Sequence, residues 1–77
     1  MTNTTPVLQD IHVIVVSAEE ASFGVAELWL GDRLIGFTCY EDGELALRIE
    51  PSPADVVLGT RALTEALAQA DRLLALY

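Results

Sequence analysis

Cysteine and histidine are scarce in this chain of 77 residues, which has one of each, Cys39 and His12. A single cysteine excludes an internal disulfide, and two ligands are too few for a tetrahedral structural zinc site. A domain of this length usually gains only about 3–5 kcal/mol of net stability from its core. Association with a second chain is the remaining common way to stabilise it.

Positive charge is also scarce. Four arginines face 12 acidic residues, and there is no lysine, so the formal net charge is −8. Direct nucleic-acid binding is disfavoured, because neutralising phosphates requires clustered cations. No segment is long and apolar enough to span a bilayer, and residues 1–10 lack the basic and apolar regions of a signal peptide. We therefore expect a cytoplasmic protein that binds neither nucleic acid nor membrane.

Common catalytic and cofactor motifs are missing as well. The sequence has no glycine-rich phosphate loop, no G-x-S-x-G elbow, no H-E-x-x-H helix and no EF-hand-like loop. Cys39 and His12 both fall in apolar runs, where packing explains them better than chemistry. We expect no enzyme activity, no cofactor and no metal site.

Apolar residues, in contrast, make up 52% of the chain, more than one thin core readily hides. The β-branched run 11–16 predicts a first strand with both faces buried. The acidic stretch 17–24 is interpreted as an irregular connection. Three further strands are predicted at 25–30, 33–40 and 44–50.

The turn at residues 31–32 sets which side chains share a face in the middle of the sheet. A two-residue turn there pairs Leu30 with Arg33. Because directly opposed residues project to the same side, one apolar face is predicted to form. Its members in these two strands are Ala26, Leu28, Leu30, Ile35, Phe37 and Cys39.

The second turn has two possible forms. A two-residue loop would place Glu41 opposite Glu44, two like charges, and send residues 45, 47 and 49 to the other face. A three-residue loop over 41–43, with Gly43 in the left-handed conformation and a bulge, pairs Tyr40 with Glu44 instead. We favour the three-residue loop, because it adds Leu45, Leu47 and Ile49 to the apolar face.

The opposite face of the sheet is the candidate contact face. It is predicted to carry Val25, Trp29, Leu34, Tyr40 and Arg48. Tryptophan, tyrosine and arginine are enriched in binding surfaces. Aromatic residues also suit strands simply because they pack well across a pleat, so both interpretations stay open.

A long helix is predicted over residues 53–77. Ser52 is a suitable N-cap, Pro53 suits the first helical position, and Asp55 lies near the positive end of the helix dipole. Gly59 indicates either a close approach to a strand or a tolerated glycine. The apolar stripe predicted to lie on the sheet comprises Val56, Leu63, Leu67, Ala70, Leu74 and Tyr77, with Ala66 and Leu73 beside it.

Such a helix would be about 37 Å long, whereas a seven-residue strand spans about 23 Å, so its end would overhang the sheet. The first strand would be an uncharged sheet edge, which invites pairing with another strand. Both features predict a homodimer. Its candidate contacts are Val13, Val15, Leu73, Leu74 and Tyr77.

The sequence therefore predicts an α+β fold, an antiparallel four-stranded sheet in the order β-β-β-β-α with one long C-terminal helix on one face. Residues 1–6 are expected to be a flexible leader, and 7–77 one domain. We expect a non-enzymatic, acidic interaction or regulatory protein, acting as a homodimer that binds another protein. The alternatives are small-molecule binding at a dimer seam walled by Trp29 and Tyr40, and an antitoxin-like acidic inhibitor that occupies a basic site.

Overall fold

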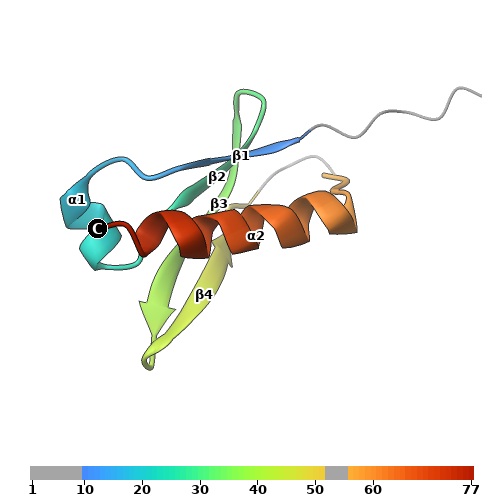
Figure 1. The fold of residues 1–77 in the computed structure, drawn as a ribbon. Coiled ribbons are helices and arrows are strands. Elements are labelled where there is room, and N and C mark those ends of the chain that lie inside the picture. Colours follow the sequence, from blue (N-terminus) through green and yellow to red (C-terminus); the bar gives the residue numbers. More distant parts are fainter. Residues whose placement is uncertain (1–9, 52–55) are drawn as a thin grey trace, which may run out of the picture.

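Strands that follow one another in the sequence also lie side by side in space. The computed structural model describes residues 10–51 and 56–77, and its strands form one antiparallel sheet in the order β1-β2-β3-β4. The elements are β1 (Ile11–Ile14), α1 (Ala18–Ser22), β2 (Glu27–Leu30), β3 (Arg33–Glu41), β4 (Glu44–Ile49) and α2 (Thr60–Leu74). Figure 1 shows α2 lying across one face of the sheet. The predicted fold class is confirmed, whereas the predicted leader, residues 1–6, lies outside the described residues.

The connection between β1 and β2 contains a short helix, α1, that the sequence reasoning missed. The Ser17 side chain caps it by accepting a hydrogen bond from the Glu20 backbone N–H at 3.1 Å. Gly24, with φ +74°, follows its last turn. Serine followed three residues later by glutamate is a capping signal, and a glycine in the left-handed conformation is a usual helix stop. Five helical residues are too few to show a periodic apolar pattern, so these two signals were the only ones present.

The two turns within the β2–β4 meander are both tight. Leu30 pairs with Arg33, as predicted for the first. At the second, Glu41 pairs with Glu44, and the two loop residues Asp42 and Gly43 have φ values of +52° and +80°. Positive φ at both positions is the signature of a type I′ turn, so the predicted three-residue loop is wrong.

A β-bulge in β3 produces the one-residue register shift that we had expected from a longer turn between β3 and β4. Trp29 pairs with Leu34, but the next residue back, Leu28, pairs with Gly36, so Ile35 is the extra residue. Before the bulge one set of alternate residues in β3 faces the helix, and after it the other set does. Leu45, Leu47 and Ile49 therefore lie on the helix side, as predicted, even though the turn has two residues.

The same bulge moves three other residues to the opposite face from the one predicted. Phe37 lies opposite Glu27, and Cys39 lies two residues further along β3, so both project away from α2. Tyr40 projects to the helix side instead. The bulge places Gly36 against β4, where a Cβ atom would lie 2.1 Å from the carbonyl oxygen of Arg48. Only glycine fits there without a backbone shift.

Helix α2 begins later than predicted. Its N-cap is Gly59, and residues 56–58 are not helical. The predicted start signal, Ser52 to Asp55, lies outside the described residues. With 15 residues, α2 is about 22 Å long, close to the span of the strands, so the expected overhang is absent.

The core consists of two small clusters under α2. Ile11, Leu28, Ile35 and Ala66 form one, and Ala21, Ala26, Ala70 and Leu74 form the other. Four of these eight residues are alanines, so the helix approaches the sheet closely but the clusters bury little apolar volume. The predicted stripe is shifted by part of a turn, since Leu67 is 37% exposed and Tyr77 is 64% exposed.

Candidate interaction surface

The sheet face turned away from α2 has no described element over it (Figure 1). The strand pairings fix its members, because directly opposed residues project to one side. His12 opposes Trp29, Ile14 opposes Glu27, and Cys39 opposes Ala46. We call this surface the outer face, defined by His12, Ile14, Glu27, Trp29, Leu34, Phe37, Cys39, Ala46 and Arg48.

Two polar contacts order side chains of the outer face, one on β2 and one between β3 and β4. The Trp29 indole Nε1–H donates to a Glu27 carboxylate oxygen at 3.1 Å. Arg48 forms an ion pair with Glu41 at 2.5 Å, which offsets the repulsion between Glu41 and Glu44 across the turn. Both partners are exposed, so the ion pair adds little to folding stability.

The Arg48 guanidinium also meets the side chain of Cys39. Hydrogen bonds to Cys39 and to Glu41, together with the negative charge of Glu41, raise the pKa of Arg48 above its ordinary value. Arg48 is therefore cationic at every physiological pH. It supplies a positive group at the edge of a surface whose other charges are acidic.

Three of the five predicted contact-face residues, Trp29, Leu34 and Arg48, lie on the outer face. Val25 is half-buried and directly precedes β2. The placement of Tyr40 is wrong: it projects to the helix side, where its ring packs against Gly24. Sequence reasoning missed Phe37 and Cys39. The signal that could have found them is Gly36, because a glycine inside a strand often marks a bulge.

Most of the predicted dimer contacts pack against other residues of the same chain. Leu74 is 8% exposed, and Val13 and Val15 are half-buried against the same core cluster. Leu74 is buried, as its place in the predicted apolar stripe requires, and it is not exposed for a dimer contact, because the end of α2 packs beside α1 (Figure 1). Leu73 is half-buried, and Tyr77 is exposed.

Large apolar side chains are more numerous on the surface than in the core. Only four large aliphatic residues are buried among the described ones, namely Ile11, Leu28, Ile35 and Leu74. Nine large apolar residues are exposed, namely Ile14, Val16, Phe23, Tyr40, Ile49, Val57, Leu67, Leu76 and Tyr77. A surplus of this kind is typical of chains that bury surface against another molecule.

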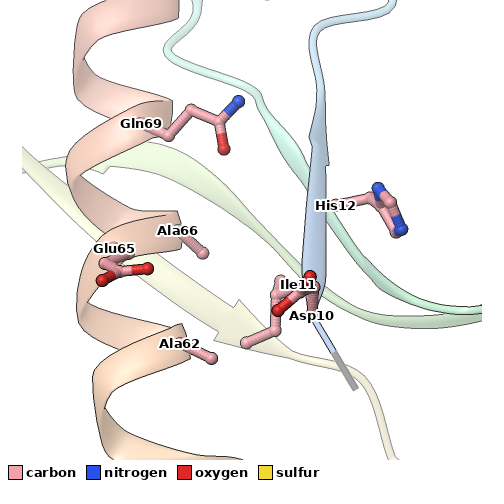
Figure 2. A pocket seen from close by; sticks show the side chains of 7 residues that line it. All are labelled: Asp10, Ile11, His12, Ala62, Glu65, Ala66 and Gln69. Atoms are coloured by element: carbon pink, nitrogen blue, oxygen red, sulfur yellow. The ribbon is translucent and has the colours of Figure 1, made fainter.

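Hollows in the described part of the chain are shallow. An apolar one of about 200 Å³ lies between β4 and the segment leading into α2, below the roughly 300–1,000 Å³ of typical ligand pockets. A polar one of about 320 Å³ lies between β1 and α2, with Asp10, Glu65 and Gln69 in its lining (Figure 2).

Two kinds of feature are absent from the described residues. No three side chains of histidine, cysteine, aspartate or glutamate come together as metal ligands would. Neither described helix has the length and apolar character needed to cross a bilayer. Comparisons with protein-family models, with curated proteins and with solved structures gave no match.

Proposed function

We propose that the chain is a non-enzymatic, cytoplasmic interaction protein that forms a homodimer through its outer face and binds another protein elsewhere. The observation that carries this proposal is the outer face itself, one whole side of the sheet with no described element over it. The two central strands carry Trp29, Leu34 and Phe37 on this face, with one carboxylate, Glu27, among them, and Arg48 lies on the edge strand β4. Aromatic residues and arginine are enriched in interfaces.

The charges on the outer face are compatible with burial against a second copy. Glu27 already accepts a hydrogen bond from Trp29, and Arg48 is already paired with Glu41. Burying a charge is most costly when it has no partner. Arg48 brings a charged partner into such an interface, whereas Glu27 brings only a neutral hydrogen-bond donor, and its burial weakens the dimer. Trp29 and Phe37, near the middle of the face, are the aromatic anchors that such an interface requires.

The size of the face predicts a weak dimer. Four strands about 4.8 Å apart and about six residues long cover roughly 400 Å² in plan, or about 800 Å² for two copies, which is below the roughly 1,200–2,000 Å² that stable interfaces bury. Each chain also carries a formal charge of −8, so two copies repel. Association at micromolar concentration, strengthened by added salt, is therefore expected.

The alternatives have less support. Trp29 and Tyr40, the proposed walls of a small-molecule site, lie on opposite faces of the sheet and cannot enclose one ligand within a chain. The acidic-inhibitor interpretation rests on net charge alone.

Light scattering coupled to size exclusion tests the proposal with two matched variants. Ile14→Asp places a charge on the outer face, and Ile49→Asp makes the same change at an exposed isoleucine on the helix side. We expect the wild type and Ile49→Asp to weigh more than 8.3 kDa at tens of micromolar, and Ile14→Asp to weigh 8.3 kDa. Circular dichroism controls for folding.

Two results would contradict the proposal. One is a wild-type mass of 8.3 kDa at every concentration and salt. The other is a dimer that survives Ile14→Asp but is lost in Ile49→Asp, which would move the seam to the helix side.

A further inference from the structure

We infer that the edge of β1 that no described strand covers, together with the hollow beside it, binds an extended segment of another protein with lysine or arginine at alternate positions. The segment adds to the sheet as a fifth strand. This inference deepens the proposed function by giving the chemistry of the protein partner. It rests on that proposal for the existence of such a partner, but not on the dimer.

Within the described residues, the edge of β1 is short, at four residues, but lacks the charges, proline and bulge that protect many sheet edges. Its four residues carry no lysine, glutamate, aspartate or proline, and its ladder with β2 has no bulge. The other edge strand, β4, carries Glu44 and Arg48, and Pro51 follows it closely. Edges without charge, proline or bulge pair readily with another strand, and proteins that bind peptides use this property.

The hollow receives the side chains of an added strand. Figure 2 shows Ala62, Ala66 and Gln69 pointing from α2 across the hollow, and Ile11 pointing toward them from β1. Alternate side chains of a fifth strand would project to the α2 side of the sheet. The two alanines leave room there, since the hollow measures about 320 Å³. His12 also lines the hollow, but its side chain points away from α2.

The lining of the hollow favours a long cationic side chain. The alanines and Ile11 supply an apolar floor, and the carboxylates of Asp10 and Glu65 lie at its margins. No described residue forms an ion pair with either carboxylate. Lysine and arginine match this arrangement, because their methylene stems cover apolar surface while the charged head reaches an acid.

A second copy of the chain fits the β1 edge less well than a cationic partner. Pairing β1 with β1 of another copy would bring Asp10 and Glu65 of both chains to one seam, where like charges repel. The net charge of −8 adds to that repulsion but attracts a basic segment and speeds its encounter. Charge therefore selects a foreign, basic strand at this edge.

Nitrogen-15 NMR titration with three end-blocked octapeptides tests the inference on the full chain. One peptide alternates valine and lysine, the second alternates valine and glutamate, and the third is the lysine peptide with alternate backbone nitrogens methylated. We expect only the first to shift the amides of residues 11–14 together with those of Glu65 and Gln69. N-methylation should weaken binding at least about tenfold, because it removes the ladder donors.

Two matched variants locate the charge contact. Glu65→Gln should weaken binding of the lysine peptide about two- to fivefold at low salt, the range expected for one exposed ion pair. Glu44→Gln, the same change on the opposite sheet edge, should leave binding unchanged.

Several outcomes would overturn the inference. Equal binding of the lysine and glutamate peptides, no binding of either, or shifts confined to the outer face would each do so. Hydrogen exchange of the free protein adds another check. Protection of all β1 amides at every dilution would show the edge covered by the chain itself, and protection that rises with concentration would show a second copy there. If the protein is a monomer and binds the lysine peptide, only the proposed dimer is contradicted. If it is a dimer and does not bind the peptide, only this inference is contradicted.

Discussion

Replacing Gly36 with alanine should be the most damaging methyl addition in the described chain. The new Cβ would lie 2.1 Å from the Arg48 carbonyl oxygen, whereas real Cβ atoms are essentially never within 3.0 Å of such a neighbour. The strands must therefore separate by at least 0.9 Å, the difference between these two distances. Ladder pairs on both sides, Gly36 with Ile49 and Phe37 with Arg48, resist that movement.

The expected loss is large compared with the stability of so small a domain. Overpacking of this kind costs about 1–3 kcal/mol, and we expect the upper end because the contact is with backbone. Against a total of about 3–5 kcal/mol, that removes more than half of the free energy of unfolding. With a urea dependence of about 1 kcal/mol per molar, the denaturation midpoint should fall by about 2–3 M.

Urea denaturation followed by the fluorescence of Trp29, the single tryptophan, measures this loss. Gly43→Ala is the matched control, because its φ is +80° but its Cβ would meet nothing within 4 Å. It should cost about 1–2 kcal/mol from backbone strain alone. A midpoint for Gly36→Ala at or above that of Gly43→Ala would refute the close approach, and with it the position of the bulge.

Substitutions at three other positions test separate parts of the fold by the same denaturation assay. Thr38→Val should cost about 1–3 kcal/mol, because the buried hydroxyl joins the Ala26 N–H to the Gly24 carbonyl, while Thr38→Ser should recover most of it. Leu74→Ala should cost about 2–5 kcal/mol if α2 ends in the core as described, and a loss under 1 kcal/mol would argue against that burial. Ser17→Ala should cost about 1 kcal/mol through the lost helix cap, and no change would mean that α1 adds nothing to stability.

The sequence pattern predicted the strands and the helix side of β4, but not the place where the register shifts. For Leu28 and Leu45 to lie on the same apolar face, the strand register must shift by one residue somewhere between them. A longer turn and a bulge would both produce this shift. The structure places the change at Ile35 and Gly36. That choice depends on how closely β4 approaches Gly36, a contact between residues 12 positions apart, which no local pattern records.

At the start of α2, a strong local signal in the sequence led to a wrong prediction. The helix was expected to include residues 56–58, and it does not. The signal at Ser52, Pro53 and Asp55 led us to continue the helix through Gly59, which is instead its N-cap. Helix length is decided by packing against the sheet more than by propensity. The last turn of α2 packs beside α1, and Leu74 is buried there.

The candidate surface was predictable in outline. Trp29, Leu34 and Arg48 were assigned to it correctly from alternation, while Phe37 was assigned to the wrong side because it follows the bulge. No pattern in the sequence indicated the hollow between β1 and α2. Its lining combines residues 10–12 with residues 62–69, which only the tertiary fold brings together.

A dilution series of the nitrogen-15-labelled protein tests the central claim, self-association through the outer face, most directly. Between micromolar and millimolar concentration, the Trp29 indole N–H and the amides of Phe37 and Cys39 should shift continuously. The amides of Ala66 and Ala70, buried between α2 and the sheet, should stay unchanged. Spectra that do not depend on concentration, or shifts gathered on α2 instead of the outer face, would contradict the claim.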